Sequence, residues 1–172
     1  MTKILVIASA LVSSIAFSQT RSTYSSGGTE VNVNVGFSSG AAAVGGTFEK
    51  DTNNVGWGGY AFLQTEEEDA GVFQTLALGG MMKAHLIKNS NIDTYIAPGF
   101  GLAMISDINV GTQQNPDEED KTVFGPSMKL GAQYFFNPDV KIGVEHFIIT
   151  NWFDDEAPGS LDFTTLVVGF EF

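Results

Sequence analysis

The sequence contains no cysteine, a single arginine and few charged residues of any kind. Without cysteine the chain has no disulfide scaffold, no thiolate metal site, no cysteine nucleophile and no lipid-modified N-terminal cysteine. Eight basic residues against 20 acidic ones give a net charge of −12. This balance argues against nucleic acid as a partner, because neutralising phosphates takes clustered lysine and arginine.

Glycine and phenylalanine are abundant instead, with 20 and 14 residues. The length of 172 residues suits one domain. Charged residues make up 16% of the chain, well below the ~25% of an ordinary soluble domain. This composition is unlike that of a soluble α/β enzyme and favours a thin β structure whose outer face does not meet water.

The N-terminus has the features of a secretory signal peptide. Lys3 supplies a positive charge, a mainly apolar run spans residues 4–17, and Ala16 and Ser18 are the small residues that a signal peptidase reads. That run is too short to cross ~30 Å of hydrocarbon. We expect a signal peptide over 1–18, a polar, flexible lead-in over 19–28 and one β domain over 29–172. Any later membrane crossing would use strands, because no later run reaches 18 apolar residues.

Alternation of period two dominates the chain from residue 31 onward. It predicts eight strands of roughly 9–14 residues, close to the ~9–11 that a tilted strand needs to cross a bilayer. Short turns are predicted at 51–54, 88–91 and 137–139. Longer connections are predicted at 66–70, 106–121 and 150–160. The pattern leaves open which way the third strand, 55–65, faces.

One face of these strands carries bulky apolar residues, and the other carries glycine, alanine and polar residues. The narrow interior of an eight-stranded barrel favours placing the small and polar set inside, while a lipid-facing exterior has room for bulky side chains. Charged residues on the inner face must then pair with one another. We therefore expect a polar plug of ion pairs rather than an open pore. Glu49, His85 and Asp93 are also expected on the inner face, and the predicted lumen network is Lys83, Lys129, Lys141, Glu145 and Glu171.

The chain ends with apolar residues at every second position, namely Leu166, Val168, Phe170 and Phe172. With the signal peptide, the eight alternating strands and the short turns on one side, this ending resembles the small eight-stranded outer-membrane barrels of Gram-negative bacteria, of the OmpA-domain and OmpX type. The resemblance implies an all-β fold, an eight-stranded antiparallel up-and-down transmembrane β-barrel, placed in the outer membrane after Sec-type secretion. It also implies that these four residues form the C-terminal signal read by the outer-membrane assembly machinery.

Catalytic chemistry finds little support in the sequence. His85 and His146 are the only histidines, and neither stands in a zinc-binding spacing. Lipid A deacylases of similar architecture carry a serine two residues after the histidine, where this chain has Ile148. The lipid A palmitoyl-transferring family begins with an amphipathic helix, and residues 19–30 show none. We expect a monomeric, non-enzymatic protein without a cofactor. The alternatives are a lipid A-modifying enzyme and a periplasmic, lipocalin-like ligand-binding barrel.

Acidic residues gather in three connections at one predicted end of the barrel. We interpret them as a solvated extracellular rim that binds divalent cations weakly, since oxygen-only clusters suit Ca²⁺ or Mg²⁺. The expected partners are outer-membrane lipid and lipopolysaccharide, and the expected role is structural support or surface contact. The predicted acidic rim comprises Glu66, Glu67, Glu68, Asp69, Asp117, Glu118, Glu119, Asp120, Asp154, Asp155 and Glu156, with Asp107 beside it.

Overall fold

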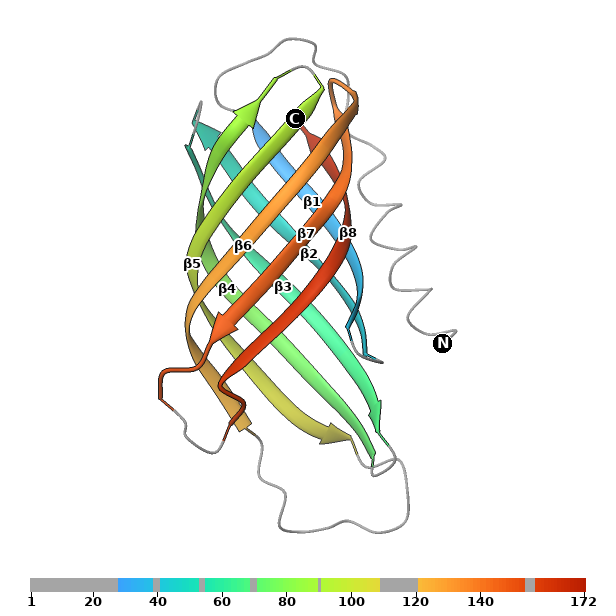
Figure 1. The fold of residues 1–172 in the computed structure, drawn as a ribbon, viewed down its shortest axis with the longest axis vertical. Coiled ribbons are helices and arrows are strands. Elements are labelled where there is room, and N and C mark those ends of the chain that lie inside the picture. The colour runs from blue at the N-terminus through green and yellow to red at the C-terminus, as the bar shows by residue number, and fades with distance from the viewer. Residues whose placement is uncertain are drawn as a thin grey trace.

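Eight strands close into one barrel in the computed structural model of the chain (Figure 1). The structure describes residues 28–38, 41–52, 55–68, 71–89, 91–108, 121–153 and 157–172. The strands are β1 (Thr29–Ser38), β2 (Ala41–Thr52), β3 (Val55–Glu68), β4 (Gly71–Lys88), β5 (Ile92–Ile108), β6 (Lys121–Asn137), β7 (Val140–Thr150) and β8 (Ser160–Glu171). No helix within the described ranges is long and apolar enough to cross a membrane. The predicted fold class, an eight-stranded antiparallel up-and-down barrel, is confirmed.

The first and last strands pair with each other and close the barrel. Every strand is antiparallel to its neighbours in sequence, and β1 pairs with β8 in a register that sets Val33 opposite Val168. Backbone hydrogen bonds of 3.0 and 2.8 Å join Thr29 to Phe172 in both directions. Each of the eight described strands therefore pairs with a neighbour on both sides, so the sheet has no edge strand. We call the end of the barrel that holds Thr29 and Phe172 the turn end, at the top of Figure 1, and the opposite end the loop end.

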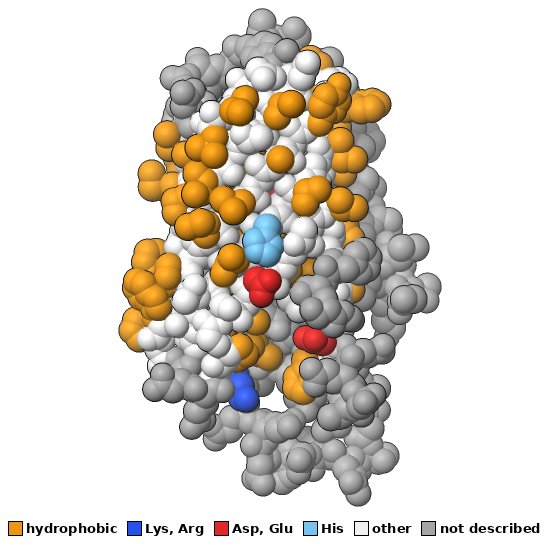
Figure 2. All heavy atoms as spheres, in the orientation of Figure 1, with side chains coloured by type: hydrophobic (Ala, Val, Ile, Leu, Met, Phe, Trp, Pro, Cys, Tyr) orange, Lys and Arg blue, Asp and Glu red, His pale blue; other side chains and the backbone are white. Residues whose placement is uncertain are grey.

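Large apolar side chains cover the outside of the barrel. Figure 2 shows a wall in which apolar and uncharged side chains predominate and charged ones are few. Leu130 and Val144 are among the exposed apolar residues, and exposed aromatic residues lie toward each end, with Phe136 near the turn end and Trp152 near the loop end. Such a belt, flanked by aromatic side chains, is the exterior that a transmembrane barrel presents to lipid.

The structure settles the facing of β3, which the sequence pattern left open. Tyr60 and Phe62 point into the barrel and are almost fully buried, whereas Trp57 lies exposed on the outside. The inward positions nearer the turn end are Gly56 and Gly58. Aromatic residues and glycines therefore share the inner face of this strand. This mixture hides the alternation between bulky apolar and small or polar residues on which the sequence prediction depends.

Several strands are longer than the sequence indicates. β4 has 18 residues, and β5 and β6 have 17 each, against the predicted 9–14. The break predicted at 66–70 is wrong for its first residues, because Glu66 pairs with Phe73 and Glu68 with Gly71. Asp51 and Thr52 likewise are the last two residues of β2 rather than the start of a turn. Backbone pairing persists at these positions because ladder hydrogen bonds do not depend on the polarity of the side chains.

Two register irregularities interrupt the ladders near the turn end, one between His85 and Ile87 and the other between Phe135 and Asn137. At the first, Leu86 and Ile87 are both exposed on the outer wall. A β-bulge of this kind re-aims the side chains beside it. The His85 side chain, next to the irregularity, points into the barrel with 1% of its surface exposed.

Candidate functional site

The interior of the barrel holds two layers of different chemistry. Toward the turn end lies a charged group that we call the turn-end cluster. Toward the loop end lies a group of four aromatic rings that we call the aromatic layer, formed by Tyr60, Phe62, Phe147 and Phe163. A central ion pair, Lys129 and Glu145, stands between them. The turn-end cluster comprises Glu30, Glu49, Asp51, Lys83, His85, Lys88, Asp93, Lys141 and Glu171.

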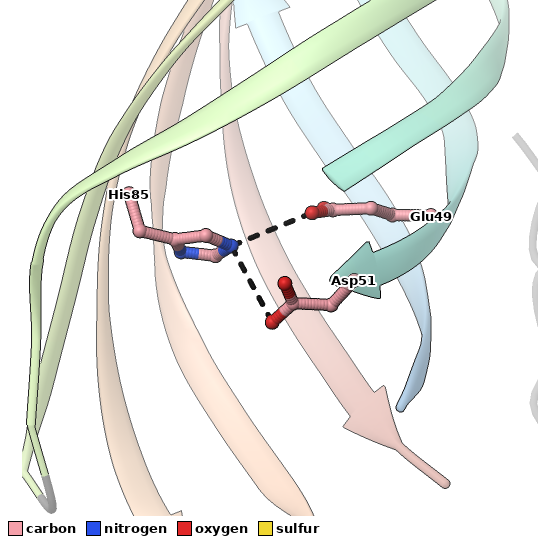
Figure 3. A group of neighbouring side chains, drawn as sticks. All are labelled: Glu49, Asp51 and His85. Carbon is pink, nitrogen blue, oxygen red and sulfur yellow. Dashed lines mark ion pairs between the residues drawn. The ribbon is translucent and has the colours of Figure 1, made fainter. Parts of the chain in front are cut away.

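His85 points toward two carboxylates of the turn-end cluster, those of Glu49 and Asp51 (Figure 3). Its Nε2 atom lies 3.4 Å from Glu49 Oε1 and 3.7 Å from Asp51 Oδ2. Its Nδ1 atom lies 2.6 Å from Asp93 Oδ1. One histidine from β4 therefore faces three carboxylates, two from β2 and one from β5.

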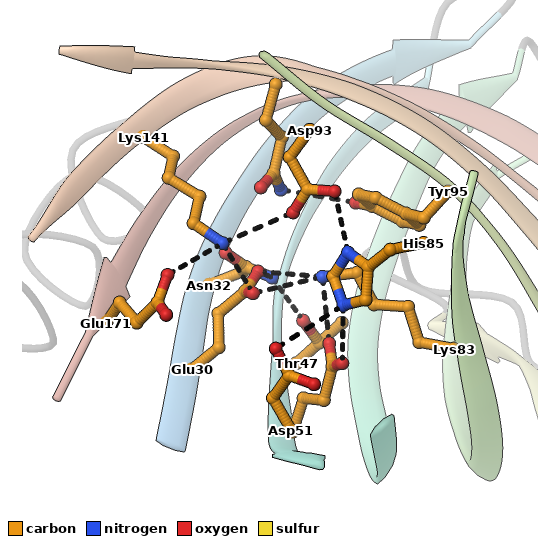
Figure 4. A network of polar contacts seen from close by, with 12 residues as sticks. Glu30, Asn32, Thr47, Asp51, Lys83, His85, Asp93, Tyr95, Lys141 and Glu171 are labelled. Atoms are coloured by element: carbon orange, nitrogen blue, oxygen red, sulfur yellow. Dashed lines mark hydrogen bonds and ion pairs between the residues drawn. The ribbon is translucent and has the colours of Figure 1, made fainter. Parts of the chain in front are cut away.

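Lys83 and Lys141 share the carboxylate of Glu30 (Figure 4). The Nζ of Lys83 lies 3.0 Å from Glu30 Oε1, and the Nζ of Lys141 lies 2.8 Å from Glu30 Oε2. Lys83 also pairs with Glu49 Oε2 at 2.8 Å, and Lys141 with Asp93 Oδ2 at 3.3 Å. Because both lysines are fully buried, this shared pairing supplies the compensation that a buried charge requires.

The cluster opens toward the turn end. Lys88, at the end of β4, pairs with Asp51 and lies 3.8 Å from Glu171 Oε1. Glu171 also pairs with Lys141 at 3.2 Å. The side chains of Lys88 and Glu171 are 21% and 25% exposed, in contrast to the fully buried lysines deeper inside. Solvent therefore reaches the cluster from this end.

The central pair is held by several hydrogen bonds. Lys129 Nζ lies 3.1 Å from Glu145 Oε1, while Asn34 Nδ2 donates to Glu145 Oε2 at 2.5 Å. The Tyr95 hydroxyl donates to Glu145, and Gln133 Nε2 donates to the Tyr95 oxygen at 3.2 Å. The ring of Tyr95 also lies beneath the Lys83 ammonium, 4.0 Å from its centroid. Tyr95 thus connects the central pair to the turn-end cluster.

The aromatic layer fills the loop-end half of the interior. The ring centroid of Phe147 lies 4.6 Å from Tyr60, 5.3 Å from Phe62 and 5.1 Å from Phe163. These spacings are typical of tilted and edge-to-face aromatic contacts. Around the rings lie the buried side chains of Ala43, Ala77, Ala97, Ala103, Val123 and Ile149. The expected filling by ion pairs is therefore limited to the turn-end half and the centre, because most buried positions nearer the loop end carry apolar residues, with Thr75 and Ser127 as polar exceptions.

The structure brings the five predicted lumen residues inside the barrel. Lys129 and Glu145 pair with each other, Lys141 pairs with Glu171, and Lys83 pairs with Glu30 and Glu49. Sequence reasoning missed Glu30, Asp51 and Lys88. Strand parity could have found the first two, since Glu30 shares a face with Asn32 and Asn34, and Asp51 shares one with Glu49. For the aromatic layer, strand parity places Phe147 on the face of Lys141 and Glu145. Tyr60 and Phe62 gave no such signal, because they lie on the strand whose facing the pattern left open.

Other predicted residues fall partly outside the described part of the chain. The acidic residues Asp69, Asp117, Glu118, Glu119, Asp120, Asp154, Asp155 and Glu156 lie there, as does the predicted signal peptide, 1–18. Glu66 is half-buried at the loop end of β3, and the backbone of Glu67 and Glu68 completes that strand. On β8, Leu166, Val168 and Phe172 are exposed on the outer wall and Phe170 is half-buried.

Comparison with known proteins agrees with this architecture. Residues 5–172 match the model of a protein family described as outer membrane protein beta-barrel domain, while no curated protein matches the chain.

Three solved structures illustrate the likeness. The N-terminal β-barrel domain of Pseudomonas aeruginosa OprF is 15% identical with a TM-score of 0.61, covering 85% of this chain and 99% of that one. Neisserial surface protein A is 13% identical with a TM-score of 0.60, covering 85% and 96%. Ail of Yersinia pestis, solved with the heparin analogue sucrose octasulfate, is 13% identical with a TM-score of 0.56, covering 86% and 100%. At such identities the likeness is one of fold.

Proposed function

Because the chain belongs to the outer membrane protein β-barrel domain family and is located in the outer membrane of a Gram-negative bacterium, we propose that it is a monomeric, non-enzymatic barrel with a closed interior. In this proposal the outer wall anchors the protein in lipid, and the acidic connections at the loop end face the medium outside the cell. The protein then functions in structural support of the membrane or in contact at the cell surface.

The observation that carries the proposal is the filling of the interior by successive layers. An eight-stranded barrel has room only for side chains, and here Lys83, Lys129, Lys141 and Phe147 all lie inside with at most 2% of their surface exposed. An ion crossing the barrel would have to break the paired charges of the turn-end cluster and the central pair, and then displace the aromatic layer. Both steps are costly, because they leave buried charges unpaired and disrupt close packing.

The loop end supports the surface role through its charge. Twelve of the 20 acidic residues belong to the connections after β3, β5 and β7 or to the ends of the strands that lead into them. The up-and-down topology brings these three connections to the same end of the barrel. Transmembrane barrels of this type have short periplasmic turns and longer extracellular loops. An acidic extracellular rim would attract cations and, through divalent ions, the phosphates of lipopolysaccharide.

A rival hypothesis is that the protein modifies lipid A. The described side chains that come closest to a catalytic arrangement for this reaction lie on the outer wall. His146 Nδ1 lies 3.0 Å from Thr164 Oγ1 on the neighbouring strand. A histidine beside a hydroxyl is the start of a nucleophilic site, but such a site also needs a third group that orients the base. Mass spectrometry of lipid A from cells with and without the protein tests this hypothesis. We expect identical spectra, and a change that His146→Gln abolishes would establish the enzyme instead.

Conductance measurements test the closed interior directly. The protein purified from outer membranes is inserted into planar bilayers, and a variant altered only on the outer wall, Phe136→Ala, serves as the matched control. We expect no steady ionic conductance from either. A stable open level in the unaltered protein would contradict the proposal, because a filled interior cannot carry a sustained current.

A separate experiment distinguishes surface contact from support. Replacing Asp117, Glu118, Glu119 and Asp120 with Asn or Gln removes four charges without touching the described wall. If the rim acts by surface contact, cells carrying this variant lose divalent-cation-dependent resistance to detergents while the barrel level in the membrane stays unchanged. Full resistance at an equal barrel level would restrict the role to structural support.

A further inference from the structure

We propose that Glu49, Asp51 and His85 bind one divalent transition-metal cation of the zinc class inside the turn end of the barrel (Figure 3). The two carboxylates come from β2 and the imidazole from β4, so the site assembles only when β3 holds these strands on either side of it. This site is independent of the acidic rim, which lies at the opposite end of the barrel.

The spacing of the three side chains suits a shared cation. One ligand atom from each residue lies within 4.8 Å of the others. His85 Nε2 is 3.4 Å from Glu49 Oε1 and 3.7 Å from Asp51 Oδ2. Zinc bonds of about 2.0–2.2 Å in tetrahedral geometry set neighbouring ligand atoms roughly 3.3–3.6 Å apart. Two of the three separations therefore need almost no adjustment.

The orientation of the histidine is fixed by Asp93. The carboxylate of Asp93 lies 2.6 Å from His85 Nδ1 and accepts the proton that this nitrogen carries. In the neutral ring, the lone pair is then on Nε2, which points at Glu49 and Asp51. A carboxylate that holds the far nitrogen of a histidine is the usual support of a metal-binding imidazole. Asp93 is therefore a positioning residue for this site.

Two of the atoms aimed at the centre of the site lack hydrogen bonds. Within the described residues, His85 Nε2 and Glu49 Oε1, which face each other, are buried and have no hydrogen-bond partner. Asp51 differs, because its Oδ2, the oxygen that faces His85, accepts a hydrogen bond from Lys88, and only its Oδ1 is buried without a partner. The side chains of His85, Glu49 and Asp51 are 1%, 0% and 7% exposed. A neutral imidazole whose lone pair faces two carboxylates is repulsive, because buried polar atoms without partners are costly. Either a proton on Nε2 or a cation among the three side chains relieves this repulsion.

The net negative charge of the turn-end cluster also favours the binding of a cation. Five carboxylates face three lysines in this cluster, which leaves a net charge of −2 when His85 is neutral. Protonation of His85 would remove only one of these two charges, whereas a divalent cation removes both. A buried cluster is most stable when its charges are fully compensated.

Two glycines on β3 make the site sterically possible. Gly56 lies opposite Asp51 on one side and Lys83 on the other, and a Cβ at this position would collide with the carboxylate of Glu49. At Gly58, opposite Glu49, a Cβ would collide with the backbone oxygen of Phe48. Glycine at the inward positions of β3 thus lets Glu49 extend across that strand toward His85, which is a typical use of glycine within a strand.

The donor set selects the metal. Imidazole nitrogen with two carboxylates suits zinc and its neighbours, whereas sites for Ca²⁺ and Mg²⁺ use oxygen ligands alone. Three protein ligands leave a fourth position for water. Entry is from the turn end, where Lys88 and Glu171 are partly exposed.

A binding experiment on the intact protein tests the site. The protein, without a polyhistidine tag, is purified from outer membranes in detergent, stripped with a chelator and titrated with Zn²⁺ in excess Mg²⁺, which saturates oxygen-only sites. We expect one zinc per barrel. His85→Gln should weaken binding about tenfold or more, and Asp93→Asn roughly 10–100-fold. The matched control His146→Gln, altered on the outer wall, should bind like the unaltered protein.

Two further measurements keep the result decisive. Folding of His85→Gln is checked on a detergent gel, where the unheated, folded barrel migrates differently from the heated protein. If this variant does not fold, Asp51→Asn is used instead, because Asp51 lies near the solvent-accessible turn end, and it should show the same loss of zinc binding. In a ¹⁵N spectrum, zinc should shift the Nε2 resonance of His85 and leave both nitrogens of His146 unchanged. The proposal is overturned if the unaltered protein binds no zinc under these conditions, if a folded site variant binds equally well, or if His85 does not respond.

Discussion

Lys129 and Glu145 face each other near the middle of β6 and β7, with Nζ 3.1 Å from Oε1 and both side chains 1% exposed. They are diagonal neighbours, since Glu145 lies opposite Gly131 in the ladder. Glycine at position 131 leaves room for the Tyr95 ring, which a Cβ there would strike. The pair and its supporting tyrosine thus depend on a missing side chain as much as on the charges present.

Breaking this pair should destabilise the barrel strongly. Lys129→Met and Glu145→Gln should each cost about 3–5 kcal/mol, because each leaves a buried charge without its partner. The double variant should cost much less than the sum of the two. Urea unfolding in lipid vesicles, followed by tryptophan fluorescence, measures all four species. Additive losses would mean that the two side chains do not interact.

Arginine on the outer wall should be tolerated according to depth. Leu130→Arg and Val144→Arg, both at strand centres, should cost about 2–4 kcal/mol, and Phe136→Arg near the turn end about 0–1. The same unfolding measurement compares them. The inward and outward assignment is tested separately by Leu102 and the adjacent inward Gly101: if Arg is equally tolerated at these two positions, the assigned facing of β5 is incorrect.

The aromatic layer should contribute as a packed core. Phe147→Ala removes a ring that contacts three others, and the resulting cavity should cost about 3–5 kcal/mol. Phe136→Ala, on the outside and 77% exposed, is the matched control and should cost far less. Near-equal losses would show that the interior near the loop end is loosely packed rather than closed.

The sequence predicts the number of strands and the facing of most of them. Both follow from the alternation of residue types along each strand, which is a local property of the sequence. β5 illustrates this: Tyr95 and Ala103 are buried inside while Phe100 and Met104 are exposed. The same reasoning stops at β3, where Tyr60 and Phe62 are bulky and yet inward. Residue size alone cannot distinguish an aromatic side chain in lipid from one in a packed interior.

The turn-end cluster shows a second limit. Asp51 and His85 are 34 positions apart in sequence and lie on strands that are not neighbours. Their approach depends on the ladder register, on the irregularity beside His85 and on the space at Gly56. Motif spacing detects only ligands that share one strand or helix. A search for histidine motifs therefore could not find the proposed site, whose ligands lie on strands on either side of β3.

The orientation of the barrel in the membrane can be tested with a protease that cuts after glutamate. The chain has ten glutamates. Four of them, Glu30, Glu49, Glu145 and Glu171, belong to the turn-end cluster or the central pair. The other six, Glu66, Glu67, Glu68, Glu118, Glu119 and Glu156, belong to the loop-end connections or the strand ends beside them.

Intact cells treated with this protease should yield cleavage within residues 106–121, the longest connection, after Glu118 or Glu119. Cleavage is expected there because long, polar connections are the preferred sites of proteolysis and because the start of β1 and the end of β8 share the turn end, which would face the periplasm. A periplasmic protein that stays uncut shows that the outer membrane is sealed. If cleavage in this connection requires permeabilised cells, the loop end faces inward. Surface contact through the acidic rim would then be impossible, whereas the zinc site and the closed interior would be unaffected, since neither depends on which end faces the medium.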